Sequence, residues 1–355
     1  MGAGEQIISR SVSAREFWER SKFVPILDVR SPGEYQHGHI PDAINVPLFS
    51  DQQRAAVGIT YKKSGRQPAV QKGLELVGPQ LAGLVKKAIS IARNGDVLVH
   101  CWRGGMRSQS FAAILELACL RTTVLNGGYK AYRAMSRCSF ERPFKFLVIS
   151  GFTGAGKTDV LRLLDQAGEQ VIDLEGFANH RGSAFGGVGQ LQQPTTEQFE
   201  NLLFEKIDRL DLTKTVWVED EGNRIGGVVV PPAIYDRIRH SPAVSIDRTL
   251  ERRVNNLLID YGDLPGEQLI VSIEKIRKRL GGLATQQAVA SVDSADVKSA
   301  IEIVLAYYDK TYQSAMNDMP RETTVPLAAD NLTEAELVES LRQISQQIYG
   351  ETADC

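Results

Sequence analysis

The sequence predicts an α/β protein made of two successive α/β units followed by a helical C-terminal extension. Over residues 1–140, short apolar runs of strand length alternate with segments of helical spacing, and the same alternation resumes after a short connector. Residues 283–355 are rich in Ala, Gln, Glu and Leu, with apolar residues at helical spacing. A chain of 355 residues has room for two or three domains. We therefore expect domains at 1–140, 141–282 and 283–355.

Composition and charge exclude several classes of protein. The chain carries 41 Lys and Arg against 43 Asp and Glu, so a polyanion would have to be met by local basic patches. The longest apolar run is about five residues, far below the length of a membrane helix, and the N-terminus lacks the pattern of a secretory signal. Four irregularly spaced cysteines predict neither a disulfide framework nor a zinc site. We expect a reduced, cytoplasmic protein without a structural metal and without a membrane partner.

The strands and helices of the first unit follow from the spacing of its apolar residues. Residues 25–29, 96–100 and 122–125 form apolar runs of strand length. Residues 82–92 and 108–117 have helical spacing. Alternation of this kind predicts a parallel sheet covered by helices.

A loop that could activate a cysteine follows the strand at 96–100. Residues 97–108 read VLVHCWRGGMRS, so Cys101 comes after an apolar run and before a helix that begins near Ser108. Loop N–H groups, the start of a helix and the charges of Arg103 and Arg107 all stabilise a thiolate. We predict that Cys101 is a nucleophile and that the two arginines bind an anionic substrate.

Two families share such a loop. His100-Cys101, five residues, then Arg107-Ser108 matches the signature of cysteine-dependent phosphatases, in which the arginine forks onto phosphate. Residues 27–48, LDVRSPGEYQHGHIPDAINVPL, closely resemble the rhodanese domain, which has the same fold as the Cdc25-type phosphatases. The resemblance favours handling of sulfur or selenium over phosphate hydrolysis, and it implies that Cys101 carries the chalcogen as a persulfide.

The second unit opens with a phosphate-binding loop. Residues 151–158 read GFTGAGKT, and they lie between an apolar strand at 146–150 and a helix at 159–167, as a P-loop requires. The glycines let backbone N–H groups converge on phosphate oxygens, the lysine supplies a positive charge, and the threonine can reach Mg²⁺. The predicted phosphate-binding residues are Gly151, Gly154, Gly156, Lys157 and Thr158.

Polar groups that would complete this site follow two further strands. The strand at 171–175 ends in Asp173 and Glu175 and the strand at 215–220 ends in Glu219 and Asp220; either pair could hold a metal ion. A Gly-rich loop at 178–187 carries Arg181, and Arg224 follows the second strand. We expect both arginines to meet an anion, and the sequence leaves the choice of acid open.

The order of these blocks resembles the tRNA 2-selenouridine synthase family. CWRGGMRS is followed by GFTGAGKT, DLEGFANHRGSAFG and WVEDEGNRIG, and the likeness covers roughly residues 10–280. The resemblance implies a fold with an N-terminal rhodanese-like domain and a P-loop NTPase-like, parallel-sheet domain. It also implies conversion of 5-substituted 2-thiouridine at the wobble position into 2-selenouridine with selenophosphate, through an S-geranyl intermediate made from geranyl diphosphate.

The site residues fit this chemistry. Lys157 and Thr158 could hold the diphosphate of geranyl diphosphate as a leaving group without ATP, and Mg²⁺ is compatible with the threonine although no cofactor is required. Family members often have two adjacent cysteines in the loop, whereas position 100 is His here, so Cys101 is the only candidate selenium carrier. The implied partners are the tRNA anticodon loop and a selenophosphate-producing enzyme.

A tRNA partner requires basic surface, because phosphate contacts dominate affinity for nucleic acid. Of the basic clusters, the one from Arg133 to Lys145 is our first choice because it spans the junction of the two predicted domains. The others are Lys62-Lys63-Arg66, Arg248-Arg252-Arg253 and Lys275-Arg277-Lys278-Arg279. Three rival hypotheses are a P-loop kinase or ATPase with a regulatory rhodanese module, a phosphatase using Cys101 and Arg107, and a tRNA-binding module without catalysis.

Overall fold

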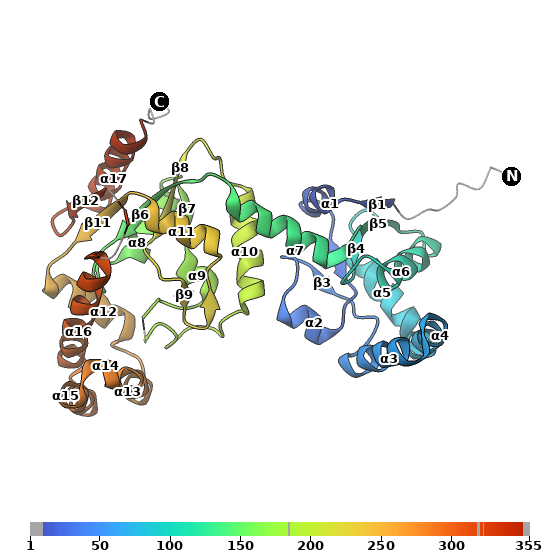
Figure 1. The fold of residues 1–355 in the computed structure, drawn as a ribbon, viewed down its shortest axis with the longest axis horizontal. Coiled ribbons are helices and arrows are strands. Elements are labelled where there is room, and N and C mark those ends of the chain that lie inside the picture. The colour runs from blue at the N-terminus through green and yellow to red at the C-terminus, as the bar shows by residue number, and fades with distance from the viewer. Residues whose placement is uncertain (1–9, 184, 318–319, 322, 351–355) are drawn as a thin grey trace. The chain divides into compact units, whose positions relative to one another are not determined.

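The computed structural model describes residues 10–183, 185–317, 320–321 and 323–350 (Figure 1). It divides the chain into two compact units, Met1–Ser139 and Phe140–Cys355. Each unit contains its own five-stranded sheet in which all paired strands are parallel. The α/β class predicted from the sequence is confirmed.

The first unit is a parallel sheet with strand order β1-β5-β4-β2-β3. Helices α3 and α4 meet at Gly65, whose φ of 85° suits a glycine at that turn. Its buried core contains Leu27, Val99 and Phe111. The elements are β1 (Arg10–Val12), α1 (Ala14–Ser21), β2 (Ile26–Asp28), α2 (Pro32–His37), β3 (Ile44–Asn45), α3 (Asp51–Ser64), α4 (Arg66–Val77), a 3₁₀ turn (Gly78–Gln80), α5 (Leu81–Ile91), β4 (Asp96–His100), α6 (Met106–Leu117), β5 (Arg121–Leu125) and α7 (Gly128–Cys138).

The second unit is built on the order β12-β11-β6-β8-β7. A 3₁₀ turn (Ser139–Glu141) precedes its first strand. Its elements are β6 (Lys145–Ser150), α8 (Lys157–Gln166), β7 (Gln170–Ile172), α9 (Leu174–Ala178), α10 (Thr196–Asp208), β8 (Thr215–Glu219), the hairpin β9 (Arg224–Ile225) and β10 (Val228–Val229), α11 (Pro232–His240), β11 (Ala243–Asp247), α12 (Leu250–Tyr261), α13 (Gly266–Lys275), α14 (Arg277–Leu280), α15 (Gly282–Asp293), α16 (Val297–Asn317), β12 (Thr324–Ala328) and α17 (Glu334–Tyr349).

The position of β6 in this sheet explains where the phosphate loop lies. The chain leaves β6 toward β7 and β8 on one side and later reaches β11 on the other side. In parallel sheets of this kind, ligands bind outside the carboxyl end of the strand where the direction of winding changes. The GFTGAGKT loop follows the carboxyl end of β6 and therefore occupies that point.

The C-terminal region differs from the expectation of a separate helical segment. Residues 324–328 form β12, which pairs in parallel with all five residues of β11, and α17 adds Leu341 to the same buried core as Trp217. The sequence Thr-Val-Pro-Leu-Ala contains a proline, which cannot donate a ladder hydrogen bond, and β12 is accordingly an edge strand. Residues 283–355 are thus part of the second unit.

A second apolar core in this unit lies among helices rather than on the sheet. Helices α12, α13, α15 and α16 contribute Tyr261, Ile273, Ala288 and Val304 to a cluster of its own. The cavity described below opens within this cluster.

Candidate active sites

The cysteine loop connects β4 to α6 in the first unit. Cys101 is 3% exposed, and its Sγ lies 3.2 Å from Oγ of Ser108, in the first turn of α6. The sulfur therefore lies at the start of a helix, as the sequence predicted, where the helix dipole favours negative charge.

The start of α7 fixes the shape of this loop, a contact that the sequence pattern did not predict. The N–H groups of Tyr129 and Lys130 donate to the carbonyls of Cys101 and Trp102, at 2.8 and 3.0 Å. Gly128 has a φ of 61°, and a Cβ there would collide with the backbone of the cysteine loop. The Asn-Gly-Gly sequence that leads into α7 was the signal for such a close approach of two backbone segments.

A buried charge cluster lies behind the loop. The Arg30 guanidinium is fully buried, donates to both carboxylate oxygens of Asp28, and lies 3.9 Å from the ring centroid of Tyr129. Nε2 of His100 is 3.6 Å from Oδ2 of Asp28. Burial nevertheless lowers the pKa of His100 to about 4, against the opposite effect of Asp28, so this imidazole is neutral at physiological pH. His100 therefore supports the loop without adding a group that titrates near pH 7.

The two arginines of the loop have different surroundings. Nη1 of Arg107 donates to Oε2 of Glu34 at 2.8 Å. Burial opposes charge on both groups, but their pairing prevails: it raises the pKa of Arg107 and lowers that of Glu34. An anion that binds Arg107 must therefore share it with Glu34. Arg103 is exposed.

Cys101 borders a cavity of about 700 Å³ between its loop and helix α3. Part of its wall is formed by Trp102, Val57 and Tyr61. Arg103 and Lys62 add positive charge to the cavity. The cavity is wide enough to admit a bulky group to the neighbourhood of the sulfur.

The phosphate loop has the backbone that its glycines predicted. Gly151, Gly154 and Gly156 have φ values of 144°, 81° and 77°. Nζ of Lys157 lies 3.2 Å from the carbonyl oxygen of Gly151, and Thr158 donates its hydroxyl to Glu175 at 3.0 Å. The lysine and the threonine thus both lie at the loop, where a bound phosphate would be.

Acids from helix α9 and from the end of β8 meet beside this loop. The strand expected at 171–175 ends at Ile172 instead, so Glu175 lies in α9. The N–H of Glu175 donates to Oε1 of Glu219 at 2.7 Å, so the structure brings together the two alternatives that the sequence left open. Burial raises the pKa of Glu175, Glu219 and Glu221, and for Glu221, with the added effect of Glu175, it does so to about 8. Glu221 is therefore largely protonated at neutral pH, which reduces repulsion of an anion at the loop. Within the described ranges, no three His, Cys, Asp or Glu side chains are grouped so as to hold a metal ion.

The other two acids predicted from the sequence, Asp173 and Asp220, have structural partners. Asp173 caps α9 and accepts the N–H of Gly176 at 2.6 Å. Arg321 donates to both carboxylate oxygens of Asp220, at 2.9 and 3.0 Å, and both side chains are 3% exposed. From α16, the hydroxyl of Tyr312 accepts the N–H of Gly151 at 2.8 Å and is 2.6 Å from Oγ of Ser150. The contacts of Arg321 and Tyr312 join segments more than 100 residues apart, and no local pattern in the sequence signals them.

Arg181 and Arg224 have different surroundings. Nη1 of Arg181 pairs with Asp260 at 2.8 Å, and its guanidinium lies over the ring of Tyr261. Arg224 is exposed in β9. The next residue after Arg181, Gly182, lies against the acids, since a Cβ there would be 2.6 Å from Glu175 and 2.8 Å from Glu221. The predicted loop therefore reaches the phosphate site through its backbone.

In two of the four basic clusters, some residues are wholly or partly buried. Arg142 donates to the carbonyls of Ile207 and Leu210, and Lys145 donates to that of Thr213. Arg253 pairs with Asp309 at 2.6 Å and its side chain is 6% exposed. The clusters Lys62-Lys63-Arg66 and Lys275-Arg277-Lys278-Arg279 are exposed throughout.

Fold and sites together define a protein with a rhodanese-like unit followed by a P-loop unit. Residues 13–135 match the model of the rhodanese-like domain, and residues 144–345 match that of the tRNA 2-selenouridine synthase AAA domain. The chain belongs to the tRNA 2-selenouridine synthase family. None of the helices in the described part of the chain is long and apolar enough to cross a membrane.

Relatives named tRNA 2-selenouridine synthase cover most of the chain. The protein of Bdellovibrio bacteriovorus is 34% identical over 90% of this chain and 95% of its own length. That of Pseudomonas fluorescens is 34% identical over 81% and 87%, and that of Marinobacter nauticus is 31% identical over 88% and 93%.

Proposed function

We propose that this protein replaces sulfur by selenium in 5-substituted 2-thiouridine at the wobble position of tRNA, with selenophosphate as the selenium donor and S-geranyl-2-thiouridine as the intermediate. The observation that carries the proposal is the presence, in one chain of this family, of a complete cysteine loop and a complete phosphate loop. A regulatory rhodanese module would not need Cys101 at the start of a helix beside an open cavity.

The geranylation step is assigned to the phosphate loop. The sulfur of 2-thiouridine attacks carbon 1 of geranyl diphosphate, the bond from that carbon to oxygen breaks, and diphosphate leaves. The loop N–H groups and Lys157 would stabilise the negative charge of the leaving group. Protonated Glu221 is consistent with an anion at this position. The step consumes no ATP.

The selenium step is assigned to the cysteine loop. The selenium of selenophosphate forms a bond to carbon 2 of the S-geranyl uridine, the bond from that carbon to sulfur breaks, and geranyl thiol leaves. Water then cleaves the selenium–phosphorus bond, which releases phosphate and leaves 2-selenouridine. Arg103 and Lys62, which border the same cavity as Cys101, would attract both selenophosphate and the tRNA backbone. Cys101 is the proposed reactive group at this step, and Arg107 is its positively charged neighbour.

The test is nucleoside mass spectrometry on tRNA from cells with and without the gene, together with reactions of the purified protein. We expect 2-selenouridine only with the intact protein. The Lys157→Ala variant should give no S-geranyl product from geranyl diphosphate. Stoichiometric ATP hydrolysis during the reaction would instead favour a kinase or ATPase, and turnover of an aryl phosphate would favour a phosphatase.

A further inference from the structure

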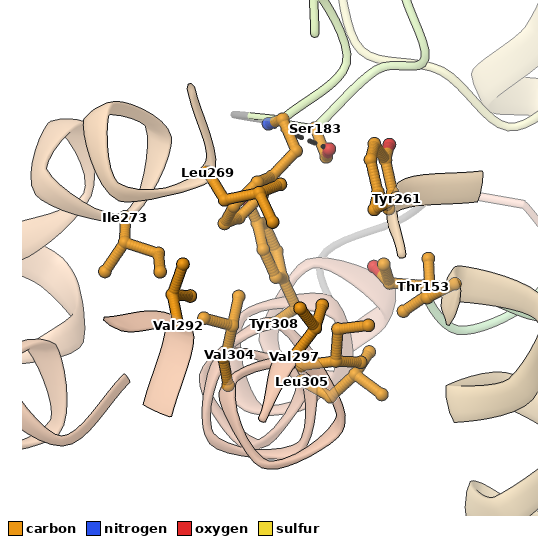
Figure 2. Close-up of a pocket in the computed structure, with 14 residues that line it drawn as sticks. Thr153, Ser183, Tyr261, Leu269, Ile273, Val292, Val297, Val304, Leu305 and Tyr308 are labelled. Carbon is orange, nitrogen blue, oxygen red and sulfur yellow. Dashed lines mark hydrogen bonds between the residues drawn. The ribbon is translucent and has the colours of Figure 1, made fainter. Parts of the chain in front are cut away.

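An apolar cavity lies within the helical cluster of the second unit (Figure 2). It is walled mainly by Leu269, Val304 and Leu305, with Tyr261 and Tyr308 on its sides, and no charged side chain lines it. About 490 Å³ of space lies between the side chains, including the open mouth, but the centre of a water molecule can reach only about 50 Å³ of it. Little of its space is therefore open to water, and we call this tight apolar cavity the slot.

The slot begins at the phosphate loop. Thr153, a residue of GFTGAGKT, lines the slot with its side chain, as Figure 2 shows. Helix α12 is fastened to the same loop, because Arg253 donates to the Thr153 carbonyl at 3.0 Å and Asn256 donates to the Gly154 carbonyl at 2.9 Å. A molecule with an anionic head at the loop could thus place its remainder in the slot.

Helix α16 also connects the slot with the phosphate loop. Tyr308 lines the slot, and Tyr312, one turn later, reaches the N–H of Gly151 with its hydroxyl. On another side, Ser183 and Phe185 of the Gly-rich loop border the slot. The loop that the sequence marked as an anion-binding segment therefore also covers an apolar site.

We propose that this slot binds the hydrocarbon chain of a prenyl diphosphate whose diphosphate is held by the P-loop. The inference deepens the proposed function and rests on it, because it takes the loop to bind the diphosphate of the geranyl donor. An apolar void without an occupant reduces stability, whereas a hydrocarbon chain would gain free energy for each methylene that it buries. The slot would thus select a prenyl diphosphate over inorganic diphosphate and over nucleotides, whose polar rings have no partners there.

The test compares two isoleucines of α16 that are two residues apart. Ile301 lines the slot, whereas Ile303 packs in the same cluster without lining it. Ile301→Phe fills the slot, and Ile303→Phe is the matched control. Calorimetry would measure the binding of inorganic diphosphate and of geranyl diphosphate to the full chain, with thermal unfolding as a check on folding.

We expect the wild type and Ile303→Phe to bind geranyl diphosphate at least tenfold more tightly than inorganic diphosphate. Ile301→Phe should lose this preference and keep its affinity for inorganic diphosphate. If Ile301→Phe fails to fold, Val297→Phe, on a half-buried position of the same slot, takes its place.

Two results would overturn the inference and leave the proposed function standing: equal affinity of the wild type for both ligands, or an unchanged preference in the slot-filling variant. A different result would overturn both proposals. The P-loop does not hold a diphosphate if the wild type binds neither inorganic nor geranyl diphosphate. The same conclusion follows if the Lys157→Ala variant binds both ligands as tightly as the wild type does.

Discussion

Cys101 differs from the other described cysteines in its surroundings. It is buried at the start of α6, whereas Cys119 and Cys138 are exposed; Cys355 lies outside the described residues. Cys101→Ser should reduce selenium incorporation to background, because a hydroxyl of similar size is a far weaker nucleophile than a thiolate. Nucleoside mass spectrometry of tRNA from a strain carrying the variant measures this. Cys119→Ser and Cys138→Ser are the controls, and wild-type levels of 2-selenouridine with Cys101→Ser would exclude the assigned role.

Glu221 makes stability depend on pH. Its pKa rises from 4.5 in the ordinary state to about 8 in the folded protein, so the folded state holds a proton that the unfolded state releases between these values. The contribution of Glu221 to stability should therefore fall as the pH rises from about 4.5 to about 8. His100, whose pKa is lowered to about 4, contributes in the opposite direction below pH 6.5, so the effect of Glu221 is read from the difference between the wild type and the Glu221→Gln variant. Glu221→Gln cannot lose that proton, and its Tm should exceed the wild-type Tm by several degrees at pH 8.5 but not at pH 5.

Thermal unfolding of both proteins across this pH range gives the comparison. Glu302→Gln is the control. Glu302 is exposed, so this variant loses a carboxylate that is not buried. If the Tm of the wild type and the Tm of Glu221→Gln depend on pH in the same way, Glu221 is ionised in the folded protein at neutral pH.

For individual residues, the sequence predicted the positions that a local motif determines. Lys157 and Thr158 lie at the phosphate loop because a strand, a Gly-rich turn and a helix are contiguous in the chain. The contact partners of the predicted residues could not be predicted in this way. Arg107 meets Glu34 and Asp220 meets Arg321 across 73 and 101 residues, and only the packed sheet brings them together. Raised pKa values at Glu219 and Glu221 depend on burial, which spacing alone does not supply.

Among the helices, α7 contacts the cysteine loop, and a substitution at its start tests the importance of that contact. Gly128→Ala places a methyl group against the backbone of Cys101 and Gly104 and forces an alanine into a positive φ. Gly95→Ala has the same conformational cost, since its φ is 79°, but meets only the end of the Arg121 side chain. We expect Gly95→Ala to lose roughly 1–2 kcal/mol of stability. Gly128→Ala should lose more and should also lose the selenium step.

Urea unfolding and 2-selenouridine analysis would measure both effects. Equal stability and equal selenium incorporation in the two variants would mean that α7 does not hold the loop in shape.

Strand prediction succeeded where apolar runs were short and bounded. Residues 96–100 form β4 as expected, and the expected strands at 25–29 and 122–125 correspond to β2 and β5 within one or two residues. β12 was missed because Thr324–Ala328 alternates exposed and half-buried residues at a sheet edge and contains a proline. Its strand conformation depends on pairing with β11, which the local sequence does not encode.

For the whole molecule, tRNA binding is the property that depends on surface charge. The cluster at 133–145 was the first choice from sequence, but Arg142 and Lys145 are engaged by backbone carbonyls. Lys62 and Lys63 are exposed, and Lys62 borders the cavity at Cys101. Reversing both to Glu should weaken tRNA binding and flatten its dependence on salt, because fewer phosphates are then neutralised. Affinity for geranyl diphosphate should not change.

Filter binding over a series of salt concentrations would give the slopes. Arg137→Glu, an exposed change in the other cluster, shows whether that region contributes as well. Unchanged affinity and slope in the Lys62→Glu, Lys63→Glu protein would move the tRNA path to another basic surface, with Lys275–Arg279 the next to test.

The late position of β12 and α17 in the chain has a consequence for synthesis on the ribosome. The first unit contains all of its own strands and can fold as soon as its residues emerge, since domains fold as units from the N-terminal side. The second sheet lacks its edge strand, and Asp220 lacks Arg321, until the last of these segments is translated. A nascent chain would therefore possess a finished cysteine loop well before it possesses a finished phosphate site, so a stalled ribosome would display only the first of the two.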